Sequence, residues 1–370
     1  MTHRPPTYAE GLWRVSRHAD VRAVLADPRF VVPAPPPAPP SATGTAGMGW
    51  LRSAVSRFAN GPEHARRRAR AGSLLAPLDL HGLRAEAFGH ASAELSRTDP
   101  IDVMDRLARR VPVGVLSTAL GVPEERREDA VAAVTAIAAA YHPPGHAPAS
   151  GDRRTAEGDR GVAALAALLG HPGPERLAAV AGLLVQACDA TAGLIGTTLI
   201  LTTSPPPDPR APRDPRAPHG PRGPAGPPAR WPVEALLAES LRYDPPVRLT
   251  RRTATVDTVL GGAAVPAGAV LVLDLAAANR DPHAFRDPDR FDPGRERDPG
   301  HLGFGGGLRP CPGDGVATAL AAGVVEAARG HVRAEPEDGY EPSPNLRVHS
   351  RLILRRPGRP DGRLHGGPHE

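Results

Sequence analysis

The stretch Phe304-Gly-Gly-Gly-Leu-Arg-Pro-Cys-Pro-Gly313 contains one of only two cysteines in a chain of 370 residues. A lone cysteine is ordinarily a small buried residue, so its neighbours decide its role. Glycines on both sides of Cys311 allow backbone to approach its sulfur closely. A helical run from Asp314 to Arg329 follows, and its N-terminus would direct positive partial charge at the sulfur, which favours a thiolate.

Five residues of this stretch have the spacing of the cysteine-ligand loop of the cytochrome P-450 superfamily: Phe304, Gly307, Arg309, Cys311 and Gly313. The sequence resembles the soluble bacterial branch of that family. The resemblance implies a mainly α fold with small β-sheets, in which haem b lies between a central helix and the cysteine loop. It implies that Cys311 is the axial iron ligand, that Arg309 pairs with a haem propionate and that Phe304 shields the sulfur. A thiolate ligand pushes electron density toward the iron and favours O–O cleavage.

Further matches follow in the family's order. Glu239 and Arg242 fit its Glu-x-x-Arg pair, since residues three apart on a helix share a face. Arg252 resembles the propionate-binding arginine of the next strand, with Arg251 as the alternative if the register slips.

Upstream, His64 and Arg68 resemble the histidine and arginine, four residues apart, that reach the propionates in the family. A solvated basic face is the alternative interpretation of this arginine-rich helix.

The central helix of the family carries an acid beside an alcohol, which help to deliver protons to dioxygen. Here the segment reads Gln186-Ala-Cys-Asp-Ala-Thr191. The register without a gap places Asp189 at the acid, Ala190 at the alcohol and Thr191 at the following position. A register shifted by one makes Thr191 the alcohol and leaves Ala190 at the acid. The acid and alcohol pair is incomplete in either register, and Cys188 is predicted to be a helix-packing residue.

Composition excludes several other functions. All 45 basic residues are arginines, and without lysine neither a P-loop nor a pyridoxal Schiff base is possible. The net charge of +5 does not indicate nucleic acid as a partner, because aromatic residues make up only 4 % and offer few stacking platforms. Two cysteines are too few for a disulfide framework, which favours the cytoplasm. The apolar run from Leu177 to Leu201 contains Gln186 and Asp189, so we expect a buried central helix and no membrane span.

The chain is predicted to form one domain over residues 1–356, followed by a disordered tail at 357–370. Proline-rich insertions are predicted at 33–40 and 205–230, the second with a polyproline II period, either as a linker or as a docking strip for an acidic partner. Apolar periodicity predicts helices over 51–75, 101–120, 126–141, 160–169, 176–201 and 232–243. Strands are predicted at 12–16, 250–260, 270–275 and 346–354.

The resemblance implies a haem-thiolate monooxygenase that oxidises a small-molecule or peptide natural product, using dioxygen and electrons from a ferredoxin and its reductase. The incomplete proton relay keeps open an oxidase that couples or rearranges its substrate without inserting oxygen. A non-catalytic haem or ligand-binding scaffold is the third possibility. The segment between Ala140 and Arg160 is short for the family, so the resemblance leaves the substrate open.

Overall fold

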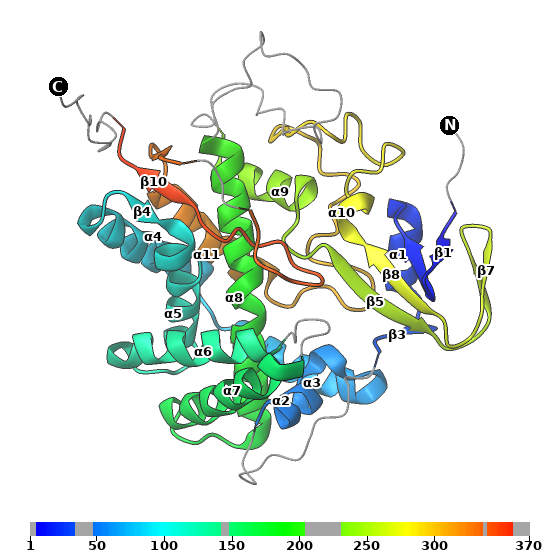
Figure 1. The fold of residues 1–370 in the computed structure, drawn as a ribbon, viewed down its shortest axis with the longest axis horizontal. Coiled ribbons are helices and arrows are strands. Elements are labelled where there is room, and N and C mark those ends of the chain that lie inside the picture. The colour runs from blue at the N-terminus through cyan, green and yellow to red at the C-terminus, as the bar shows by residue number, and fades with distance from the viewer. Residues whose placement is uncertain (1–4, 34–46, 142–147, 204–230, 336–338, 358–370) are drawn as a thin grey trace, which may run out of the picture.

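The computed structural model describes residues 5–33, 47–141, 148–203, 231–335 and 339–357. Apart from Pro33 and Pro357, the predicted proline-rich insertions and the predicted tail lie outside these residues. The described chain is mainly α-helical with small sheets, as predicted (Figure 1). Its α-helices are α1 His18–Ala26, α2 Met48–Ala54, α3 Gly61–Leu75, α4 Leu80–Arg97, α5 Arg110–Ala119, α6 Arg127–Tyr141, α7 Pro148–Leu168, α8 Pro174–Thr203, α9 Val233–Tyr243, α10 Leu275–Ala278 and α11 Asp314–Ala327.

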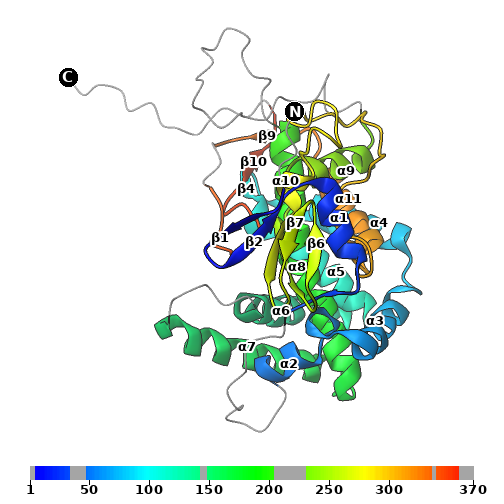
Figure 2. The same cartoon turned by 90° about the vertical axis from the view of Figure 1, so that its right-hand side faces the viewer.

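The 30-residue helix α8 runs through the middle of the molecule. It is long and apolar enough to cross a membrane, yet 72 % of its most apolar window is buried against other parts of the chain. Helices α2, α6 and α7 gather around one end of α8, and α9 lies beside the other (Figures 1 and 2). The apolar run therefore forms the central core helix that the sequence predicts.

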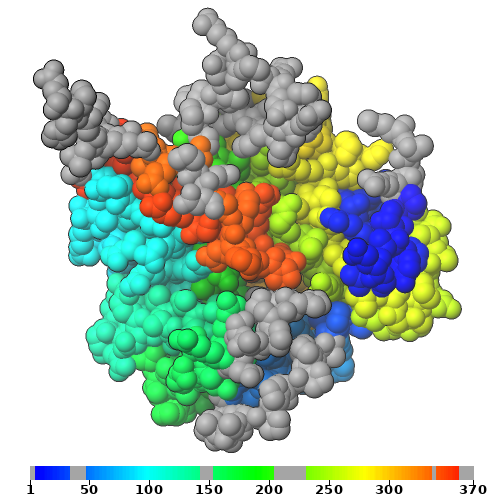
Figure 3. All heavy atoms as spheres, viewed as in Figure 1, coloured from blue at the N-terminus to red at the C-terminus, as the bar shows by residue number. Residues whose placement is uncertain are grey.

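The strands lie on both sides of α8: those of the five-stranded sheet on one side, and β4 and β10 on the other (Figure 1). A five-stranded sheet has the order β1-β2-β8-β5-β3, a three-stranded sheet the order β4-β10-β9, and β6 pairs with β7. The strands are β1 Thr7–Ala9, β2 Leu12–Val15, β3 Phe30–Val31, β4 Ile101–Asp102, β5 Leu249–Ala254, β6 Thr258–Leu260, β7 Ala263–Val265, β8 Val270–Asp274, β9 Val332–Arg333 and β10 Ile353–Arg355. In space, the C-terminal segment lies across the middle of one face of the molecule (Figure 3).

Several predicted elements have different bounds in the structure. The helix predicted over 51–75 is divided into α2, a 3-10 turn at Ser56–Phe58 and α3. The α2 helix ends at Ala54, where Val55 has an extended backbone, and Gly61, with a φ of 58°, and Pro62 mark the start of α3. The helix predicted over 101–120 begins instead with the short strand β4 and a π-helical turn at Met104–Ala108. The strand predicted over 346–354 is reduced to β10, and that predicted over 250–260 is divided between β5 and β6.

Candidate functional site

The cysteine loop is fixed by its own backbone and by α1. The backbone N–H of Cys311 donates to the carbonyl of Phe304 at 2.8 Å, and that of Leu308 donates to the carbonyl of Leu25 at 3.0 Å. Gly307 has a φ of 60°, and a Cβ atom there would overlap the Leu25 carbonyl group. Only glycine therefore combines this backbone conformation with this close approach.

Gly307→Ala is expected to lower the free energy of unfolding by at least about 1–2 kcal/mol, because a positive φ alone costs that much for a residue with a Cβ. The overlap with Leu25 adds to this cost. Gly306→Ala is the matched control, since its Cβ would meet only side-chain carbons, at 4.0 Å. Urea titration of the two variants measures the difference, and equal stability would contradict this account of the loop.

The sulfur of Cys311 lies at the junction between this loop and α11. Burial is the largest influence and raises the pKa of the thiol; the charge of Asp314 acts in the same direction. A hydrogen bond from the Gly313 backbone and the positive charge of Arg68 act in the opposite direction. Burial therefore favours the neutral thiol over the thiolate when no metal is bound. A bound cation would reverse this balance, since metal coordination deprotonates a thiol.

A cluster of basic side chains lies beside the cysteine loop. Burial, together with the positive charges of Arg309, Arg68 and Arg252, lowers the pKa of His64 to about 4, so all four side chains lie close together. Burial and Arg57 lower the pKa of Arg252 to about 10. These side chains come from α3, β5 and the cysteine loop, so the fold brings together the four residues that the sequence predicted as propionate partners.

The arginines of this cluster donate to neutral oxygens. Arg309 donates to the carbonyl of Ser56 at 3.0 Å and to Oδ1 of Asn60 at 2.9 Å. Arg252 donates to the carbonyl of Arg251 at 2.8 Å, and Arg68 to the carbonyl of Pro310. The described residues form no salt bridge with any of the three arginines.

Cations that are partly or wholly buried without a paired carboxylate suit an anionic ligand. Haem fits this set of residues, because it carries two carboxylates for the arginines and an iron atom that the sulfur of Cys311 could bind. The alternative of a solvated basic face concerned the helix that carries His64 and Arg68, and both of these side chains are partly buried.

One face of helix α8 lies near the cysteine loop. A cavity of about 140 Å³ is lined by Gly182, Leu183 and Gln186 of α8, and also by Pro312, next to Cys311. Because a helix repeats every 3.6 residues, Ala190 lies one turn beyond Gln186 on the same face. Ala190 is therefore the residue of the 189–191 segment that α8 turns toward the cysteine loop.

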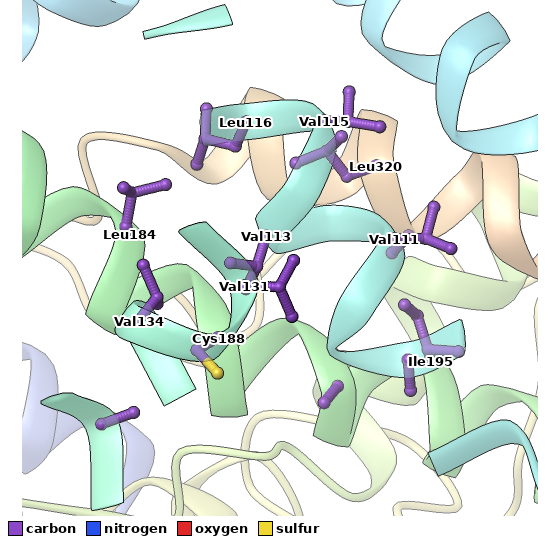
Figure 4. Close-up of a cluster of buried hydrophobic side chains, with 14 of the residues drawn as sticks. Val111, Val113, Val115, Leu116, Val131, Val134, Leu184, Cys188, Ile195 and Leu320 are labelled. Carbon is purple, nitrogen blue, oxygen red and sulfur yellow. The ribbon is translucent and has the colours of Figure 1, made fainter. Parts of the chain in front are cut away.

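Thr191 lies on another face of α8. With Leu184, Cys188 and Ile195 it forms a stripe at helical spacing, and those three pack among valines of α5 and α6 (Figure 4). The Thr191 hydroxyl is buried and has no hydrogen-bond partner among the described residues. Cys188 is a packing residue within this core, as predicted, and burial raises its pKa.

The carboxylate of Asp189 is held by Arg109, a residue that no motif in the sequence singles out. Nε of Arg109 donates to Oδ1 of Asp189 at 3.0 Å, and its NH2 group lies 2.5 Å from Glu341. Arg109 joins three separate segments of the chain, because it precedes α5 while Glu341 lies near the C-terminus. A local sequence pattern could not predict this network, because Asp189 and Glu341 are 80 and 232 residues away from Arg109 in the sequence.

The Glu239 and Arg242 pair on α9 is buried and bidentate, with distances of 2.7 and 2.8 Å. Arg242 also donates to the carbonyls of Asn279, Pro288 and Arg290 at 2.8–3.0 Å. The pair therefore anchors the segment that leads from α10 toward the cysteine loop.

Comparison with known proteins agrees with this geometry. The cytochrome P450 family model matches residues 233–321, which include α9 and the cysteine loop. Protein AknT of Streptomyces galilaeus is 31 % identical over 340 residues, covering 80 % of this chain and 72 % of that protein. The chain belongs to the cytochrome P450 superfamily.

Cytochrome p450 CYP199A2 of Rhodopseudomonas palustris is 29 % identical to this P450 over 349 residues, covering 86 % of this chain and 78 % of the relative. The crystal structure of ligand-free CYP164A2 from Mycobacterium smegmatis superposes with a TM-score of 0.71 at 26 % identity, covering 95 % and 93 % of the two chains. The chain is thus a bacterial-type P450 monooxygenase. Membership implies a haem-thiolate iron cofactor, a small-molecule substrate and redox partners that supply electrons.

Proposed function

We propose that this P450 holds haem b with Cys311 as the axial ligand and with His64, Arg68, Arg252 and Arg309 as partners of the two propionates. The observation that carries the proposal is the cluster of cations without paired carboxylates beside the cysteine loop. Phe304 contributes the carbonyl that holds the Cys311 backbone, and Gly313 contributes a hydrogen bond to the sulfur. When bound, a haem-thiolate iron supplies the activation of dioxygen.

We further propose that the substrate is a small-molecule or peptide natural product and that a ferredoxin with its reductase supplies the electrons. The likeness to bacterial P450s, including the relative from a Streptomyces species, supports this assignment. A cytoplasmic location is consistent with Cys188 and Cys311 both being free thiols.

The residues of α8 suggest how protons reach the site. General acid delivery needs a donor within hydrogen-bond reach, directly or through one water, and the methyl group of Ala190 offers none. The Asp189 carboxylate is engaged by Arg109, and the buried Thr191 hydroxyl lies on a different face of α8 from Ala190. We therefore propose the register without a gap, in which Ala190 replaces the alcohol and a hydroxyl or amide of the substrate takes its place.

Ala190→Thr is expected to lower the hydrogen peroxide released per electron pair severalfold for substrates that lack such a group, because it restores a proton donor on the face of α8 nearest the cysteine loop. Thr191→Ala is the matched control and should leave peroxide release unchanged. Peroxide and consumed reductant are measured together. Unchanged release in Ala190→Thr with a sharp rise in Thr191→Ala would instead establish the shifted register.

Turnover under labelled dioxygen separates the proposed monooxygenation from the second candidate, an oxidase that couples or rearranges its substrate. The absent alcohol at Ala190 is the observation that favours that candidate. A product that gains one labelled oxygen atom supports monooxygenation. A product with two hydrogens fewer and no labelled oxygen supports the oxidase.

A further inference from the structure

Arg57 lies at the edge of the basic cluster but is not among the residues that the sequence predicted. It belongs to the 3-10 turn Ser56–Phe58, and its charge lowers the pKa of Arg252. The carbonyls of the same turn and of Ala59 accept hydrogen bonds from Arg309. Arg57 therefore lies beside two of the proposed propionate partners.

The charges around the cluster do not balance without a further anion. Asp314 lies near Arg68. Asp314 and the two propionates of haem b supply three negative charges, which match the three arginines among the proposed propionate partners, Arg68, Arg252 and Arg309. His64 is neutral at pH 7, because its pKa is lowered to about 4. Arg57 is then a half-buried guanidinium in excess, and within the described part of the chain it forms no salt bridge.

On its other side, Arg57 lies beside an aromatic wall in which the ring of Phe58 is half-buried and the ring of Tyr141, next to it, is buried in the core. Its guanidinium carbon lies 5.8 Å from the centre of the Phe58 ring, and the rings of Phe58 and Tyr141 are 5.8 Å apart. Burial raises the pKa of Tyr141 to about 12, while the charges of Arg57 and Arg52 act to lower it. The phenol is thus protonated at neutral pH and does not neutralise either arginine.

Arg52, the other cation near this wall, already has partners. It donates to the carbonyl of Ala140, and the charge of Asp159 acts on it. Arg57 lies between the end of α6, where Tyr141 lies, and the side of the cluster formed by Arg252. A ligand that lies against the ring of Phe58 would meet this guanidinium.

We propose that Arg57 binds an anionic group of the substrate, a carboxylate in particular, while the substrate's apolar part lies against the ring of Phe58. The inference rests on the proposed function, because the charge count assumes that haem b supplies the two propionates. It identifies the substrate as an organic acid of mixed apolar and anionic character.

The test uses the haem-loaded enzyme and a library of aryl and medium-chain carboxylic acids, each paired with its primary amide. Binding is measured by calorimetry and by the absorbance change of the haem. We expect acids to bind at least tenfold more tightly than their amides. Arg57→Gln should weaken the acids at least tenfold and leave the amides unchanged, and Arg57→Glu should shift the preference to the matched amines.

Arg97→Gln is the control, because Arg97 is an exposed arginine on α4. It should change nothing. No binding by any acid, equal binding of acids and amides, or acid binding that survives Arg57→Gln would overturn the inference. The inference would also be overturned if Arg57→Gln lost as much haem as Arg309→Gln, because Arg57 would then be a propionate partner. Failure of the wild-type protein to bind haem would instead defeat the proposed function.

Discussion

Cys311→Ala is expected to abolish the strongly red-shifted absorbance band that a haem-thiolate protein gives when reduced in carbon monoxide, and to abolish oxygenation with it. The band depends on a thiolate ligand, and the sequence contains only one other cysteine. The second cysteine, Cys188, is 1 % exposed and packs between α8 and the helices α5 and α6 (Figure 4). The spectrum and the haem content of the purified variant are the measurements.

Cys188→Ala is the matched control for this prediction. It removes a thiol from the core, so it should reduce stability moderately while leaving the red-shifted band in place. If Cys311→Ala kept the band, or if Cys188→Ala lost it while retaining haem, the assignment of the axial ligand would be wrong.

The cysteine loop and the α9 pair were predictable because their chemistry is local in sequence. Cys311 is surrounded by the glycines that its loop needs, and Glu239 and Arg242 are one helical turn apart. The central helix was predictable for the same reason, since one continuous apolar run forms it. These segments fix the family and hence the overall fold.

Helix α4 was not predicted, although it has 18 residues. Its buried positions are Leu83, Ala87, Ala91 and Leu95, spaced four apart. Alanine contributes little to an apolar pattern, so two of the four core positions give a weak signal. These alanines allow α11 to pack closely against α4, so closely that a Cβ atom on Gly323 of α11 would overlap the backbone of Arg84. This packing is a tertiary contact that the local sequence pattern does not show.

The partners of the site residues were unpredictable because they come from distant segments. Asn60 accepts a hydrogen bond from Arg309, 249 residues away, while its side chain also bonds to the backbone of Val32. Arg109 reaches Asp189 only because α5 packs on α8. The sequence likewise allowed two alignments with the family's acid and alcohol positions, one with Ala190 and one with Thr191 at the alcohol. In the structure these two residues lie on different faces of α8.

Glu239→Gln is expected to lower the free energy of unfolding by about 3–5 kcal/mol, the usual cost of removing one partner from a buried ion pair. Arg242 would stay buried at 3 % exposure with three carbonyl acceptors but no negative charge. The Oε1 atom of Glu239 also accepts the backbone N–H of Asp292 at 2.8 Å, so the segment after α10 would lose part of its attachment.

The matched control is Asp129→Asn, which breaks another arginine and acid pair three residues apart. Arg126 and Asp129 are 55 % and 58 % exposed, so water screens their attraction, and the loss should be below about 1 kcal/mol. Urea unfolding of both variants gives the comparison. Losses of similar size would mean that burial does not set the value of the Glu239 pair. A large loss confined to Glu239→Gln, with reduced haem retention, would show that this pair supports the cysteine loop through the segment between α10 and Cys311.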